Sequence, residues 1–171
     1  MSTTIKVRSR GGKDVEAIID EADAALASTR RWRTCPRGYP QTEIYAGRRD
    51  GKEVYRRVGL HRWLLGLKPG DPRTVDHINR NRLDCRRSNL RICTAAENAQ
   101  NQGAHKRWNR DGMDSGMRGV TWHAEDRKWE SQVTIRGKRT YLGRFADRHK
   151  AHEAVSAFRA KNMPFAVEGA R

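Results

Sequence analysis

The sequence has few cysteines, and their arrangement excludes two common ways of stabilising a small protein. The 171 residues include three cysteines, Cys35, Cys85 and Cys93. An odd number without any C-x-x-C pair predicts neither a disulfide framework nor a four-cysteine zinc site. His61, His77 and His105 lie in the same region, but their spacing does not suit a mixed cysteine and histidine site. We therefore expect reduced thiols and no structural zinc.

Long apolar runs are also missing. No segment approaches the roughly 20 apolar residues that a transmembrane helix needs, and the first residues lack the apolar segment of a secretory signal. Hydrophobic residues make up 36% of the chain, which is low for one large core. We therefore expect small modules that act in the cytoplasm, away from membranes.

Acidic residues are scarce relative to basic ones. The chain has 36 Lys and Arg against 20 Asp and Glu, a formal net charge of +16. Residues 1–30 carry five of each sign, whereas residues 31–102 carry 16 basic and seven acidic residues and residues 103–171 carry 15 and eight. Solubility alone does not explain this excess, because acidic residues would keep a protein soluble equally well. The basic excess therefore predicts a polyanionic partner, nucleic acid before any other.

The first 30 residues differ from the rest in charge and in pattern. Apolar residues recur at helical spacing between Asp14 and Ser28, and acidic residues occupy most of the other positions. This pattern predicts an acidic amphipathic helix. Such a helix could dock on the rest of the fold, shield a basic groove or bind a protein partner. The sequence leaves these alternatives open, and it leaves the oligomeric state undetermined.

A hairpin and a short helix are expected next. The segments EIYAG and KEVYRRV flank a turn with Asp50 and Gly51, a pair typical of a β-hairpin. The segment LHRWLLGL then predicts a short helix that stops at Lys68, Pro69 and Gly70.

The candidate catalytic and metal-binding residues lie between Asp71 and Gln102. Two strand-like segments, RTVDHI and NLRICT, enclose a polar loop and lead into a helix at Thr94. Histidine is the side chain whose unperturbed pKa, about 6.5, suits proton removal at neutral pH. Carboxylate and amide oxygens are the ligands that Mg²⁺ prefers. His77, Asp76 and Asn98 supply these groups, provided that the first strand ends or bends at His77.

This strand, loop, strand and helix resembles the ββα-metal site of HNH endonucleases, particularly the homing endonucleases of phages. The resemblance covers roughly residues 41–102 and includes the His61–Arg62 pair. It implies that Asp76 and Asn98 hold one divalent cation, Mg²⁺ before Mn²⁺, and that His77 is the general base. It also implies that Asn89 braces the loop and orients His77. Cys85 departs from the pattern, since relatives frequently have asparagine there.

A second module follows a polar, glycine-containing linker at residues 103–115. The segments RGV and YLGRF, Trp129 and an alanine-rich helix resemble the Apetala-two (ERF-type) DNA-binding domain over Ser115 to Asn162. The resemblance implies a three-stranded antiparallel sheet packed on one helix. Trp129, Val133 and Ile135 alternate along the middle strand and are expected to face that helix.

The opposite face of this sheet is expected to enter a groove of double-stranded DNA. The side chains expected on this face are Arg118, Thr121, His123, Lys128, Gln132, Thr134, Arg136, Arg139 and Tyr141. Two cations of the linker, Arg107 and Arg110, are expected to bind phosphates. A merely solvated face is the alternative. Relatives in plants usually have arginine in place of Thr121, His123 and Thr134, so their target sequence does not carry over.

The sequence thus predicts an α+β protein in which a ββα-metal HNH module precedes an Apetala-two/ERF-like module. The expected segments are residues 1–30, 31–102, 103–115, 116–165 and a tail at 166–171. The expected function is metal-dependent DNA cleavage by a phage homing endonuclease in the bacterial host cell. Two alternatives are a DNA-binding regulator with an inactive HNH site and an accessory nuclease of phage packaging or recombination.

Overall fold

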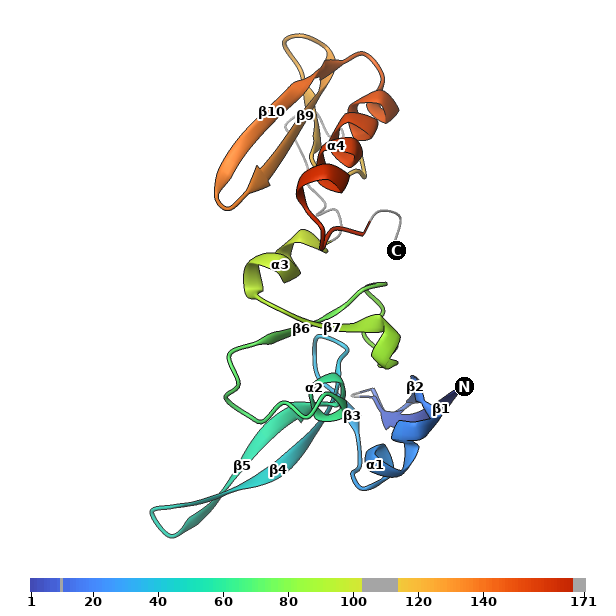
Figure 1. Ribbon diagram of the computed structural model, residues 1–171, viewed down its shortest axis with the longest axis vertical. Coiled ribbons are helices and arrows are strands. Elements are labelled where there is room, and N and C mark those ends of the chain that lie inside the picture. The colour runs from blue at the N-terminus through green and yellow to red at the C-terminus, as the bar shows by residue number, and fades with distance from the viewer. Residues whose placement is uncertain (10, 103–113, 168–171) are drawn as a thin grey trace. The chain divides into compact units, whose positions relative to one another are not determined.

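The structure is a computed structural model that describes residues 1–9, 11–102 and 114–167. The chain forms two compact units, residues 1–95 and residues 96–171. Both units combine strands with helices (Figure 1), which agrees with the expected α+β class. No helix in the described ranges is long and apolar enough to cross a membrane.

The first unit contains a five-stranded sheet in the order β2-β1-β3-β4-β5 and a two-stranded sheet of β6 and β7. Neighbouring strands are antiparallel except β1 and β3. The strands are β1 (Ser2–Arg8), β2 (Asp14–Asp20), β3 (Arg33–Thr34), β4 (Pro40–Arg49), β5 (Lys52–Gly59), β6 (Thr74–His77) and β7 (Leu90–Cys93). The helical segments are η1 (Glu21–Asp23), α1 (Ala24–Ser28), α2 (Leu60–Leu64) and η2 (Arg87–Asn89).

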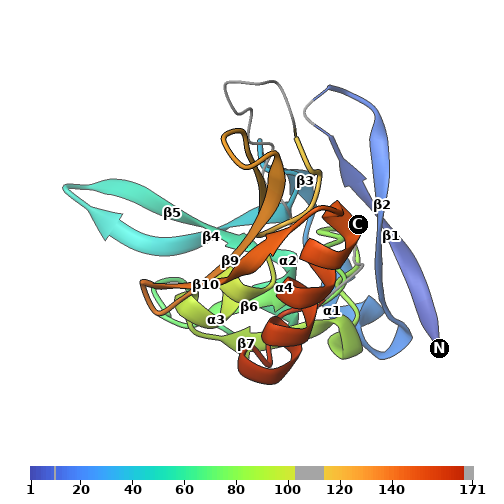
Figure 2. The same ribbon diagram turned by 90° about the horizontal axis from the view of Figure 1, so that it is seen from above.

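The prediction of an amphipathic helix over residues 14–28 is wrong for most of this segment. Residues 14–20 form β2, which pairs with β1 at every position (Figure 2), and only the five residues of α1 are α-helical. Val15, Ala17 and Ile19 point to one face of the strand, and Ala17 and Ile19 are fully buried. A spacing of two residues is the period of a β-strand. The backbone hydrogen bonds to β1 favour a strand over a helix in this segment.

The hairpin expected around Asp50 and Gly51 is confirmed. These residues join β4 to β5 with φ values of 52° and 73°. Positive φ at both central residues defines the type I′ turn, whose twist matches that of the flanking strands. The short helix expected after the hairpin is present as α2, but it ends at Leu64, before the expected stop at Lys68.

One core unites the N-terminal segment with the segment that carries the candidate site. The buried members are Val7, Ala17, Ile19, Ala27, Trp32, Leu60, Leu64, Leu67, Val75, Cys85 and Leu90. The expected boundary between residues 30 and 31 is therefore not a division of the fold. Because Ala17, Ile19 and Ala27 are buried in this core, they are not available to a protein partner.

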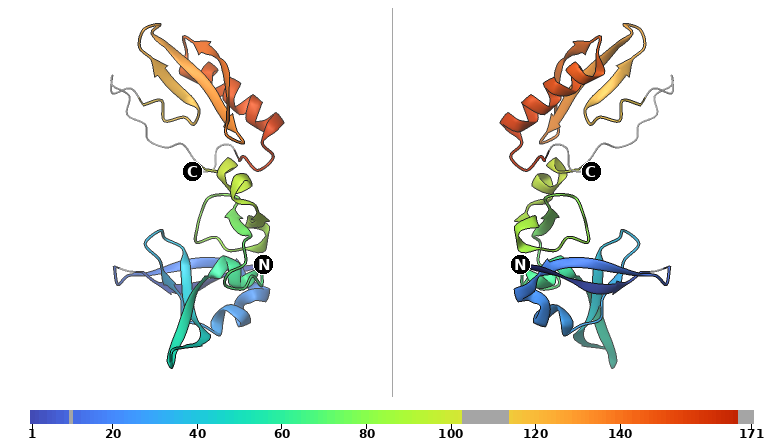
Figure 3. Two further views of the ribbon diagram at one scale, coloured as in Figure 1. Left: turned by 90° about the vertical axis from the view of Figure 1, so that its left-hand side faces the viewer. Right: turned by 90° about the vertical axis from the view of Figure 1, so that its right-hand side faces the viewer.

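The second unit has a three-stranded antiparallel sheet with α4 packed on one face (Figure 3). Its elements are α3 (Ala95–Gln100), β8 (Val120–His123), β9 (Lys128–Ile135), β10 (Lys138–Phe145) and α4 (Arg148–Asn162). Val133 of β9 packs with Ala151 and Val155 of α4, and Trp129 and Ile135 join this core. The expected three strands and helix, and the strand face that meets the helix, are confirmed.

The two units divide at residue 95, not at the expected linker. The helix α3, which the sequence assigns to the nuclease module, accepts hydrogen bonds from Arg118, Arg159 and Phe165 of the second unit. Most of the expected linker, residues 103–113, lies outside the described residues, as do Arg107 and Arg110.

Candidate active site

Asp76 and His77 are the last two residues of β6, and both are buried, with exposed fractions of 6% and 4%. Adjacent strand residues ordinarily face opposite sides of a sheet. Here the strand ends at His77, and the next turn is fixed by a bond from Arg80 N to His77 O at 2.9 Å. The strand end that the sequence requires at this position is therefore present.

The Asp76 carboxylate pairs with Arg91, its cross-strand neighbour on β7. Arg91 Nε and Nη2 donate to Asp76 Oδ2 at 2.9 and 2.6 Å. A buried carboxylate requires a positive partner to offset its lost hydration. Position 76 is thus built to hold a negative charge beside a cationic group. Sequence reasoning missed Arg91, because its partnership follows only from the register of β6 against β7.

The environment of His77 keeps its imidazole neutral. Its ring lies 5.6 Å from the Tyr39 ring and 5.1 Å from the His61 ring, measured between centroids. Burial lowers the pKa of His77 to about 4, and the nearby Asp76 and Asp84 carboxylates offset this only in part. At neutral pH the ring is therefore in the form that accepts a proton. Its Nε2 lies 3.8 Å from Cys85 Sγ.

Asn89 ties together the two ends of the loop between β6 and β7. Its Nδ2 donates to Asn79 Oδ1 at 2.9 Å and to Asp84 O at 2.7 Å. Its Oδ1 accepts from Asn79 N at 2.9 Å, and its main-chain O accepts from Ile78 N at 2.9 Å. Four bonds from one buried residue hold this loop closed.

Asp84 is a second anchor of this loop, and sequence reasoning missed it. Asn79 Nδ2 donates to its Oδ2 at 2.8 Å, and the Arg86 guanidinium donates to both oxygens at 2.8 and 2.6 Å. These contacts, those of Arg86 above all, lower the pKa of Asp84, so the buried carboxylate stays charged. The run of asparagine and aspartate between Asn79 and Asp84 was the available signal, since such residues favour local side-chain bonds to the backbone.

The N-terminal segment supports the same loop from outside. Ile18 N donates to Leu83 O at 2.8 Å, and Cys85 N donates to Ile18 O at 2.7 Å. Arg87 donates to both carboxylate oxygens of Asp23 at 2.9 and 2.7 Å. Residues 18–23 therefore act as a brace for the loop that follows His77.

Asn98, the remaining predicted site residue, lies on α3 and belongs to the second unit. Its side chain is partly buried, and its main-chain O accepts from Asn101 N at 3.1 Å. The structure thus brings Asp76, His77 and Asn89 together within the first unit and describes Asn98 within the second.

The donor set at Asp76 suits a hard cation held partly by other oxygens. Among the described residues, no group of three or more His, Cys, Asp or Glu is arranged to hold a metal ion. Mg²⁺ is commonly bound by one or two carboxylates and completes its shell with water and phosphate oxygens. A buried carboxylate such as Asp76 fits that coordination.

The polar face predicted for the second sheet is partly assembled. Gln132 lies opposite Tyr141, and Thr134 lies opposite Arg139, so these four side chains share the face away from α4. Thr121 and His123 extend the face on β8, opposite Glu130 and Lys128.

Two predicted members of that face are placed differently, and a third, His123, lies on the face but contacts another side chain. Arg136 lies in the turn after β9, with a φ of 48°, so its side chain is not part of the strand alternation. The Arg118 guanidinium donates to main-chain carbonyls of residues 99–102. His123 Nε2 lies 3.0 Å from Arg144 Nη2, and Arg144 also pairs with Glu130 and Asp126. Those two carboxylates offset positive charge at this end of the face.

Comparison with known protein families identifies the segment around Asp76 and His77. Residues 58–100 match the family described as HNH endonuclease, and the match includes Asp76, His77, Asn89 and Asn98. This segment supports an HNH nuclease with DNA as its substrate. Comparisons with curated proteins and with solved structures gave no significant match.

The buried histidine pair predicts a loss of stability on mild acidification. Burial lowers the pKa of His61 to about 3, so the folded protein excludes a proton that the unfolded chain takes up below about pH 6.5. Stability contributed by neutral His61 is therefore full above about pH 6.5 and falls as the pH drops toward 3. Between about pH 7 and pH 5 the loss is about 2 kcal/mol, with a similar loss from His77.

Urea unfolding of the parent and of His61→Phe at these two pH values tests this. The variant should lose about 2 kcal/mol less free energy of unfolding than the parent on acidification. Equal losses in the two proteins would show that His61 does not carry the effect.

Proposed function

We propose that this chain is a divalent-cation-dependent DNA endonuclease whose active site lies at the end of β6. The observation that carries the proposal is the buried His77, with its pKa lowered to about 4, directly after Asp76 in a segment that matches HNH endonucleases. The net charge of +16 suits the same substrate.

His77 is the general base of the proposed reaction. Neutral imidazole accepts the proton of a water molecule as its oxygen attacks the phosphorus. The new bond joins the water oxygen to phosphorus, and the bond between phosphorus and the 3′ oxygen breaks. The braced loop fixes the ring for this step, because Ile78, the next residue, is bonded to Asn89 O. Asn89 is therefore a positioning residue in this proposal.

Asp76 and Asn98 would hold the cation, Mg²⁺ before Mn²⁺. A bound divalent cation stabilises the negative charge that gathers on the phosphate and the leaving oxygen. Asp76 supports this assignment through its burial and its position next to His77. Asn98 enters the proposal through its position in the matched HNH segment.

The second unit would bind DNA through the polar face of its sheet. Arg139, Tyr141, Gln132 and Thr134 form the part of the face that Asp126 and Glu130 do not neutralise. Lys128 and Thr121 extend it. Arg107 and Arg110 would add phosphate contacts. The Apetala-two/ERF resemblance supports this role, and the polar side chains suit contacts to base edges and phosphates.

The biological setting that we propose is a phage homing endonuclease, on the strength of the sequence resemblance. A DNA-binding regulator with an inactive site is the first rival, and the intact Asp76, His77 and Asn89 arrangement weighs against it. An accessory nuclease that needs a protein partner is the second. The acidic helix expected over residues 14–28, which could have bound such a partner, is replaced by β2 and the short α1.

Replacement of the general base is the direct test of the site. His77→Ala should lower the rate of plasmid cleavage at least about a hundredfold, because general-base catalysis contributes about that much or more. The assay follows conversion of supercoiled DNA to nicked and linear forms with Mg²⁺, Mn²⁺ or EDTA. Binding to DNA in EDTA, measured by gel shift, should match that of the parent.

Full cleavage by His77→Ala would remove His77 from the site. No cleavage by the parent, with DNA binding intact, would favour the inactive regulator.

Loss of a cation from the polar sheet face should weaken binding without changing the chemistry. Arg139→Ala should lower gel-shift affinity about tenfold, the size expected for one good side-chain contact. The single-turnover cleavage rate at saturating protein should stay at the parental value, because Arg139 is not part of the β6 site. An affinity equal to the parent's would remove Arg139 from the DNA-binding face.

A further inference from the structure

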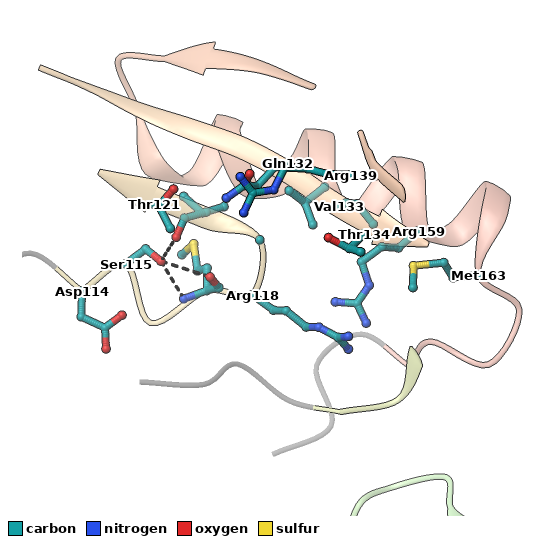
Figure 4. A pocket seen from close by; sticks show the side chains of 14 residues that line it. Asp114, Ser115, Arg118, Thr121, Gln132, Val133, Thr134, Arg139, Arg159 and Met163 are labelled. Carbon is teal, nitrogen blue, oxygen red and sulfur yellow. Dashed lines mark hydrogen bonds between the residues drawn. The ribbon is translucent and has the colours of Figure 1, made fainter. Parts of the chain in front are cut away.

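Two arginines of the second unit close the C-terminal end of α3. Arg118 Nη1 donates to Gln100 O at 2.8 Å and to Gln102 O at 2.5 Å, and its Nη2 donates to Ala99 O at 2.9 Å. Arg159 Nη2 donates to the same Gln100 O at 3.0 Å. In Figure 4 the two side chains extend toward the same side of the pocket that they line.

The helix α3 depends on such contacts. It has six residues, which is too short for a helix to be stable by itself in water. The last four carbonyls of a helix have no intrahelical donor and carry partial negative charge. Guanidinium groups satisfy both needs, since they donate several bonds from one positive centre.

Both arginines are held in place by the second unit. Arg159 lies on α4 and is 3% exposed. Arg118 lies in the turn just before β8, where Ser115 Oγ donates to Val120 O at 2.6 Å (Figure 4). A third contact comes from Phe165 N, which donates to Gln100 Oε1 at 3.2 Å. The end of α3 is therefore fixed by three separate segments of this unit.

We infer that Arg118 and Arg159 are positioning residues for Asn98, and that Arg118 is not a DNA contact. Asn98 directly precedes Ala99, the first residue whose carbonyl Arg118 binds. Fraying of the helix from this end would pass through Gln100 and Ala99 to Asn98, would break the bond from Asn101 N to Asn98 O and would misplace the Asn98 side-chain oxygen. The inference rests on the proposed role of Asn98 as a cation ligand. Cleavage then depends on the C-terminal unit for cation binding as well as for DNA affinity.

The test is the cation dependence of Arg118→Met in the full-length chain. Mn²⁺ affinity without DNA, measured by titration calorimetry, should fall about tenfold, as is typical when the support of a metal ligand is lost. The Mn²⁺ concentration for half-maximal cleavage should rise by the same factor. The maximal rate should return at high Mn²⁺, and DNA affinity in EDTA should stay at the parental value.

Arg144→Met is the matched control. It removes another arginine from the same unit, but one that bonds to Asp126 and Glu130. Its Mn²⁺ affinity and its Mn²⁺ concentration for half-maximal cleavage should equal those of the parent.

Arg118→Lys and amide hydrogen exchange keep the test decisive if Arg118→Met folds poorly. Lysine keeps the charge but lacks the planar fork that bridges three carbonyls. Exchange at the amides of residues 99–102 should speed up in Arg118→Lys, and Mn²⁺ affinity should fall in step.

Either of two results for the Arg118 variants overturns the inference. Parental Mn²⁺ affinity in both Arg118 variants would show that the arginine does not position a cation ligand. A loss of DNA affinity without any change in Mn²⁺ dependence would make Arg118 a DNA contact. A parent that cleaves DNA in a His77-dependent way but loses nothing on Arg118 substitution would leave the proposed function standing. A parent that binds no Mn²⁺ would remove both the inference and the proposed function.

Discussion

The hydrogen bonds of Asn89 are the constraint on which the candidate site depends. They close the loop between β6 and β7, and this closure allows β6 to end at His77 with both Asp76 and His77 buried. Burial in turn produces the chemical character of the two residues. The imidazole loses its charge because solvent is excluded, and the carboxylate requires a cationic partner, which Arg91 supplies. A loosely held loop would give neither property.

The parts of the chain that flank the matched HNH segment stabilise it. From the N-terminal side, β2 bonds to the loop through Ile18, and Asp23 pairs with Arg87. From the C-terminal side, Arg118 and Arg159 bond to the end of α3. An HNH segment of about 40 residues has little core of its own. Support from both flanks explains how its short strands and helix are held in place.

Local signals predicted well, and distant pairings did not. Asp50 and Gly51 specify their turn alone, and the order of Asp76, His77, Asn89 and Asn98 predicted the segment that matches the HNH endonuclease family. The pattern at Val15, Ala17 and Ile19 fits a strand as well as a helix, and only pairing with β1 decides. The partners of Arg118 are main-chain carbonyls, which leave no mark in residue type. The position of Arg118 in a basic module therefore suggested that it contacts DNA.

The proposed active site requires Asp76 to hold a catalytic cation beside His77. The most direct measurement is anomalous diffraction from crystals of the protein grown with Mn²⁺. We expect an anomalous peak about 2.2 Å from a carboxylate oxygen of Asp76, the distance of direct coordination. A peak at another group of side chains, or none near Asp76 at saturating Mn²⁺, would contradict it.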